Sequence, residues 1–236
     1  MTLAGARPEQ PVFRIGRRPD PWEWPDWRLA GRGGTFGNRW DDPLGQYRVL
    51  YASSQKLGAF LETLARFRAS PQVARELAAI DGEVDAILPG KVPASWCLGR
   101  MVSRALLAGE YADVGQHESL AHLNLELAYE VAPTLAAAGV KELDAAAIRL
   151  AVPRQITQRI SRHVYEMSTA GGWPRFAGIT YLSRLGDDLT NWAIFEPTTP
   201  AVKSPIAVVA TEPLEIEDPD FQEACELLGL EVAVAR

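Results

Sequence analysis

Two side chains of this sequence stand in surroundings that suit chemistry, Arg39 and Glu62. Arg39 lies in the glycine-containing loop GRGGTFGNR, where backbone can approach a ligand closely and a guanidinium can pair with phosphate oxygens. An ion pair with Asp41 or Asp42 is the simpler alternative. Glu62 is an acidic residue in a largely apolar segment, where a fixed carboxylate can stabilise developing positive charge. A solvated surface charge is the alternative for Glu62.

The segments around these residues predict the elements that must position them. Residues 47–52 (YRVLYA) predict a strand, and Ser53 or Ser54 would cap a following helix that runs to about Phe67. The glycines before Arg39 lack GxGxxG spacing at a strand–helix junction, so no Rossmann fold is predicted. Helices are also expected at 70–81, 118–138, 153–167 and 220–229, and strands at 177–183, 192–195, 206–211 and 230–234.

This order of elements predicts an α+β fold, because strands flank a helical centre. We expect one domain over residues 1–236, with the first and last strands meeting in space. Its parts would be residues 13–70 with one half of the site, a largely helical middle at 71–170, and C-terminal strands with the last helix at 171–236.

Composition limits the function classes. The formal net charge is −6 and the pI is near 5.2, which argues against direct nucleic-acid binding, because duplex binding normally needs a basic face. Neither a signal peptide nor a membrane-spanning apolar run is present, so a cytoplasmic location is expected. Cys97 and Cys225 predict buried free thiols, and the three histidines follow no ligand pattern, so no metal is expected.

A set of short motifs, in order along the chain, resembles the RES domain family. The motifs are G-x-R-[FW] at 37–40, L-Y-x-[AS] at 50–53, A-x-x-E at 59–62, T-Q at 157–158 and G-I-x-Y-x-S-R at 178–184. Each motif alone is weak, and the ordered set is more specific. Asp41 and Asp42, a long Trp-rich entry segment and a long helical middle depart from the commoner pattern.

The resemblance implies a fold similar to ADP-ribosyltransferase toxins, with a mixed sheet core and a helical middle insertion. It also implies degradation of NAD⁺, a substrate rather than a cofactor, and a helix-turn-helix (Xre-type) antitoxin as partner. Arg39, Tyr51, Glu62 and Ser183 are the implied catalytic residues, and Arg39, Tyr51, Ser183 and Arg184 the substrate-binding ones. A homodimer is left open.

These roles fit cleavage of the nicotinamide–ribose bond. Breaking it develops oxocarbenium character on the ribose, which the Glu62 carboxylate can stabilise, and nicotinamide leaves as a neutral base without a general acid. Arg39 would bind a phosphate, the Tyr51 ring would stack on nicotinamide or bond a ribose hydroxyl, and Ser183 would contact ribose or phosphate. No His–Asp pair has triad spacing to Ser183, so a covalent serine mechanism is not predicted.

The expected activity is that of an NAD⁺ glycohydrolase, with water as acceptor, or of a phosphorylase, with phosphate as acceptor. The sequence does not separate the two. A protein ADP-ribosyltransferase and a non-catalytic dinucleotide-binding or interaction module are the alternatives. The joint presence of Arg39, Tyr51, Glu62 and Ser183 counts against the non-catalytic module.

Overall fold

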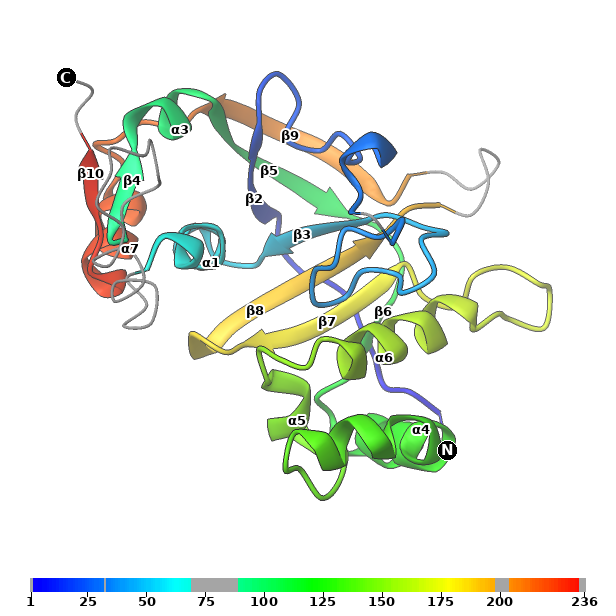
Figure 1. Ribbon diagram of the computed structural model, residues 1–236. Coiled ribbons are helices and arrows are strands. Elements are labelled where there is room, and N and C mark those ends of the chain that lie inside the picture. Colours follow the sequence, from blue (N-terminus) through cyan, green and yellow to red (C-terminus); the bar gives the residue numbers. More distant parts are fainter. Residues whose placement is uncertain (1, 32, 69–88, 198–203, 234–236) are drawn as a thin grey trace.

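The chain folds around a large, curled mixed β-sheet (Figure 1). The computed structural model describes residues 2–31, 33–68, 89–197 and 204–233. In spatial order the sheet contains β1 (Gly5–Ala6), β6 (Tyr111–Asp113), β7 (Gly178–Ser183), β8 (Gly186–Phe195), β3 (Val49–Ser53), β2 (Val12–Arg17), β5 (Arg100–Leu107) and β9 (Ile206–Pro213). Only the β6–β7 pair is parallel among these neighbours. The predicted α+β class with a mixed sheet is confirmed.

Helices gather at two places around this sheet (Figure 1). Beneath β7 and β8 lie α4 (His117–Ala137), α5 (Ala145–Arg149) and α6 (Gln155–Glu166). At the other end, α1 (Lys56–Leu64) packs against α7 (Pro219–Leu228), near α3 (Ala94–Leu98) and the parallel pair β4 (Lys91–Pro93) and β10 (Glu231–Ala233). Short 3-10 turns occupy Trp27–Leu29 and Ala65–Phe67.

Two apolar cores hold these groups of helices on the sheet. One joins α4 and α6 to β7 through residues such as Leu123, Ile160 and Ile179, and the other joins α1 to α7 through Phe60 and Phe221. All five side chains are at most 1% exposed, so each core is fully withdrawn from water. The elements that bear Arg39, Glu62 and Ser183 are therefore held in place by the packing of these two groups of helices on the sheet.

The predicted strand–turn–helix unit is confirmed as β3 followed by α1, but the expected cap is wrong. Gln55 is the N-cap residue and makes no side-chain cap hydrogen bond. The Ser53 hydroxyl instead donates to the Thr190 carbonyl, and the Ser54 hydroxyl accepts from the Trp192 indole. Both serines therefore tie the turn to β8 rather than to the first turn of the helix.

The largely helical middle expected at 71–170 is only partly correct. Helices α4 and α6 are confirmed, whereas β4, β5 and β6 lie between residues 91 and 113 and were not predicted. The last strand also does not meet the first, because β10 follows α7 and pairs with β4 outside the main sheet. The helix expected at 70–81 lies outside the described residues.

Cys97 and Cys225 are buried free thiols, as predicted, and burial raises the pKa of both, that of Cys225 to about 11. Their side chains belong to the core between α1 and α7, where neutral thiols behave as small apolar groups. In the described part of the chain, no helix combines the length and apolar character that crossing a bilayer requires.

Candidate active site

Glu62 is held by two side chains from the neighbouring strands β7 and β8, which lie far from it along the chain. Its Oε1 accepts a hydrogen bond of 2.5 Å from the Ser183 hydroxyl on β7 and one of 2.9 Å from the Asn191 amide on β8. Ser183 and Asn191 are buried, whereas Glu62 is exposed on α1. Charge-assisted bonds of this kind fix a carboxylate in one orientation. One carboxylate is thus oriented by the fold and still open to a ligand.

Arg39 approaches this carboxylate from the loop before β3. Its guanidinium lies over the Tyr181 ring, 5.1 Å from the centroid, and Nη2 donates to the Ile148 carbonyl at the end of α5. Burial lowers the pKa of Arg39, while the Tyr181 hydroxyl and the Glu62 carboxylate act to raise it. Nε of Arg39 is buried with no hydrogen-bond partner among the described residues. A donor left unpaired in this way suits an anionic ligand.

The alternative ion pairs for Arg39 are not formed. Asp41 accepts hydrogen bonds from the Tyr51 hydroxyl and from Asn38, and Asp42 accepts from two backbone amides and lies 3.4 Å from Arg162. Both carboxylates are buried and have other partners. The Arg39 guanidinium is therefore left to interact with Tyr181, Glu62 and a ligand.

Tyr51 takes part in holding the Arg39 loop. Its hydroxyl donates to Asp41 Oδ1 at 2.7 Å and accepts from the Trp40 amide at 3.0 Å. Burial raises the pKa of Tyr51 well above its usual value, and the Asp41 charge acts in the same direction. Burial also raises the pKa of Asp41. The hydroxyl is thus kept neutral, next to the residue that carries the guanidinium.

Arg184 follows Ser183 and is exposed. Its charge is close enough to lower the pKa of Arg39, after the larger effect of burial. Two positive groups near one carboxylate form a locally basic surface on a chain whose net charge is −6. Such a surface favours a ligand with more than one negative charge.

A cavity of about 180 Å³ lies between α5 and β7, and in the described part of the chain its lining does not include Arg39, Glu62, Ser183 or Arg184. Tyr181 and Ile148, the two neighbours of the Arg39 guanidinium, line it together with Arg149, Thr180 and Asp113. Ligand pockets usually measure about 300–1,000 Å³, so this cavity can enclose only one end of a dinucleotide. The remainder of such a ligand would lie along the exposed side of Glu62 and Arg184.

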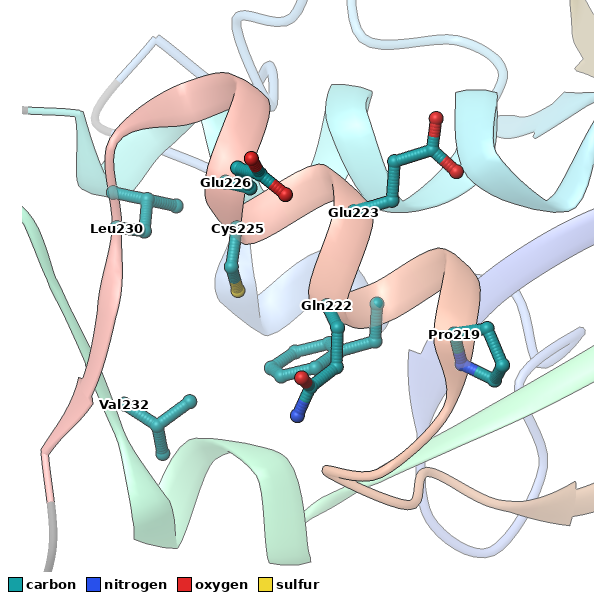
Figure 2. A pocket seen from close by; sticks show the side chains of 8 residues that line it. Pro219, Gln222, Glu223, Cys225, Glu226, Leu230 and Val232 are labelled. Atoms are coloured by element: carbon teal, nitrogen blue, oxygen red, sulfur yellow. The ribbon is translucent and has the colours of Figure 1, made fainter.

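A larger hollow of about 540 Å³ lies elsewhere, along α7 and β10 (Figure 2). Among the residues that the structure describes, its lining includes Glu223 and Glu226 but neither arginine nor lysine. A dinucleotide phosphate would meet carboxylates there without a positive partner. The smaller cavity is therefore the better candidate, because the Arg39 guanidinium contacts two of its lining residues, Tyr181 and Ile148.

The structure brings Arg39, Glu62 and Ser183 together, and places Tyr51 behind the loop of Arg39. Sequence reasoning missed Asn191 and the ring of Tyr181. The sequence does contain a signal for Asn191, because this polar residue directly precedes the apolar run WAIF. In the structure Asn191 is only 2% exposed. Buried amides normally need a partner, and here the partner is Glu62.

Within the described residues, no group of three or more histidine, cysteine or acidic side chains is arranged to hold a metal ion. Two of the histidines pair with each other, since Nε2 of His122 and Nε2 of His163 are 3.2 Å apart where α4 packs on α6. Burial lowers the pKa of His163, and the proximity of His122 adds to this effect. This contact joins two helices outside the Glu62 cluster.

No curated protein matches the chain significantly in sequence. A solved structure from M. tuberculosis, the MbcT–MbcA toxin–antitoxin complex, is similar with a TM-score of 0.54 at 10% identity, covering 94% of this chain and 92% of that one. At this identity the likeness concerns the fold. The sequence model of the RES domain matches residues 11–217, which include all the predicted site residues, and the chain belongs to the RES domain family.

Proposed function

We propose that this protein binds NAD⁺ at the site of Arg39, Glu62 and Ser183 and breaks the bond between nicotinamide and ribose. The observation that carries the proposal is the Glu62 carboxylate, which Ser183 and Asn191 orient while its outer side stays exposed. A carboxylate held in advance stabilises positive charge without reorganisation at the moment of reaction. The oxocarbenium-like ribose is such a charge.

The remaining residues supply binding. Arg39 offers the pyrophosphate a planar, charged donor group, and Arg184 adds a second positive charge. In this proposal Ser183 contacts the nicotinamide ribose or a phosphate, and Tyr51 acts beside Arg39, either through its ring or through the loop. NAD⁺ is the substrate, and no separate cofactor is required.

Two acceptors, water and phosphate, can take up the ADP-ribosyl group in this reaction. With water, the products are ADP-ribose, nicotinamide and a proton, which is the glycohydrolase reaction. With phosphate, a phosphate oxygen bonds to the ribose carbon that nicotinamide leaves, which gives ADP-ribose 1″-phosphate, nicotinamide and a proton. Arg184 beside Arg39 supports an anionic acceptor as well as an anionic substrate.

We also propose that the protein is the toxin of a toxin–antitoxin pair. Support comes from the RES domain and from the similarity to the toxin–antitoxin complex of M. tuberculosis. The proposed partner is a small helix-turn-helix (Xre-type) antitoxin that restrains NAD⁺ loss in the cytoplasm. A homodimer is compatible with this role.

Incubation of the purified protein with NAD⁺, with and without phosphate, is expected to release nicotinamide. Chromatography with mass detection distinguishes ADP-ribose from its 1″-phosphate, so the acceptor is identified in the same run. Release of nicotinamide only with an added protein acceptor would indicate an ADP-ribosyltransferase instead. Intact NAD⁺ at high protein concentration, in every arm, would contradict the enzymatic proposal.

A further inference from the structure

Side chains on one face of α6 donate hydrogen bonds to the backbone of the Arg39 loop. Four side chains at spacing i, i+3, i+4 and i+7, beginning at the N-cap residue, donate to four consecutive carbonyls. The pairs are Arg154 Nη1 with Gly37 O, Gln158 Nε2 with Asn38 O at 2.9 Å, Thr157 Oγ1 with Arg39 O at 2.6 Å, and Ser161 Oγ with Trp40 O at 2.5 Å.

Backbone N–H groups of the same loop are also hydrogen-bonded to side chains. The Asn38 amide donates to Asp41 Oδ2 at 2.7 Å, and the Trp40 amide donates to the Tyr51 hydroxyl. The loop is not a strand of the sheet, so these side chains replace the hydrogen bonds that a strand partner would provide. Gly37 has φ of 72°, which an L side chain rarely adopts, and it turns the chain into this held segment.

Thr157 is the contact closest to the guanidinium. It is 2% exposed, and its hydroxyl bonds the carbonyl of Arg39 itself as well as the Arg154 carbonyl one turn earlier. Loss of the hydroxyl would leave the Arg39 carbonyl without this buried donor, so the loop would shift to find another. A shift of the backbone at Arg39 changes the position of its guanidinium relative to Tyr181 and Glu62.

We propose that α6 is the positioning element of the Arg39 loop, and that Thr157 sets the place of the guanidinium without touching the ligand. This inference rests on the proposed function where the ligand is named as NAD⁺. It gives a physical role to the T-Q pair, since Gln158 holds the carbonyl next to the one held by Thr157. Thr157 and Gln158 are positioning residues, and Arg39 is the residue that binds.

The test compares Thr157→Val with Thr157→Ser and with Ile160→Val. Valine removes the hydroxyl, serine retains it, and Ile160 is a fully buried residue of α6 whose side chain packs in the core. A displacement of about 1 Å at a binding group can cost on the order of 100-fold, so Thr157→Val is expected to lower kcat/KM for NAD⁺ by about 10- to 100-fold. Thr157→Ser should remain within about threefold of the parent.

Hydrogen exchange of the backbone amides of residues 37–41 is the second readout. Exchange should accelerate in Thr157→Val, and not in Thr157→Ser or in Ile160→Val at similar thermal stability. If Thr157→Val does not fold, Gln158→Leu at the half-buried neighbouring position should show the same acceleration, with a smaller loss of kcat/KM. Equal exchange in the valine variants at 157 and 160, or no change in Gln158→Leu, would overturn the positioning role.

The two proposals fail separately in this design. If the parent protein leaves NAD⁺ intact, the proposed function is wrong, and hydrogen exchange alone still decides whether α6 holds the loop. If the parent cleaves NAD⁺ and Thr157→Val loses no more kcat/KM than Ile160→Val, the positioning role is wrong and the proposed function stands.

Discussion

Glu62→Gln is expected to lower the turnover of NAD⁺ by at least about 100-fold while the protein still folds and binds the dinucleotide. The amide keeps the shape of the side chain and can still accept a hydrogen bond from Ser183, but it loses the negative charge. Removal of one preorganised group that stabilises transition-state charge typically costs about 10²–10³ in kcat, or about 2.7–4 kcal/mol. Steady-state kinetics and a thermal unfolding curve check this result.

Glu223→Gln is the matched control for this change. Glu223 lies exposed on α7, beside the hollow of Figure 2, so the same loss of charge occurs on a helix outside the proposed site. Its turnover should equal that of the parent. Turnover of Glu62→Gln within tenfold of the parent corresponds to a barrier change of only about 1.4 kcal/mol and would assign Glu62 a structural role.

Arg39→Ala is expected to weaken NAD⁺ binding by about 10- to 100-fold. A charge-assisted contact between guanidinium and phosphate contributes roughly 1.5–3 kcal/mol, and that contact is lost in the variant. Arg39→Lys should restore binding only in part, because an ammonium group lacks the planar fork and stacks less well on Tyr181. Calorimetry or fluorescence titration, carried out in the Glu62→Gln background to prevent turnover, measures these affinities.

Arg159→Ala is the control for charge removal in this titration. Arg159 lies exposed on α6 and pairs with Glu130, so its loss changes the net charge by the same amount outside the loop. NAD⁺ affinity of Arg39→Ala equal to that of Arg159→Ala would show that Arg39 does not contact the phosphates.

The local elements of the site were predictable from the sequence because they depend on local pattern. The β-branched and aromatic run before Ser53 predicted β3, and the apolar spacing of Leu123, Leu127 and Val131 predicted α4. The glycines marked the Arg39 loop as a place of close approach, and the isolated acid on an apolar segment marked Glu62. The juxtaposition of Arg39 with Glu62 is visible only in the fold.

The missed features depend on contacts between distant parts of the chain. Strand β5 was overlooked because polar and apolar residues do not alternate along it, since Ser103 is buried and Leu106 is exposed, and because its two neighbours, β2 and β9, lie far away in sequence. The capping serines were misassigned for a similar reason, since β8 competes for their hydroxyls. The partners of Glu62 and of the Arg39 carbonyl are 118 to 129 residues away along the chain.

The structure of Glu62→Gln with bound NAD⁺ tests the central claim most directly. We expect the pyrophosphate on the Arg39 guanidinium, one end of the dinucleotide in the cavity lined by Tyr181 and Ile148, and the nicotinamide ribose against the exposed side of residue 62, which stays bonded to the Ser183 hydroxyl. NAD⁺ bound along α7, or bound with no phosphate at the Arg39 guanidinium, would contradict the proposed site.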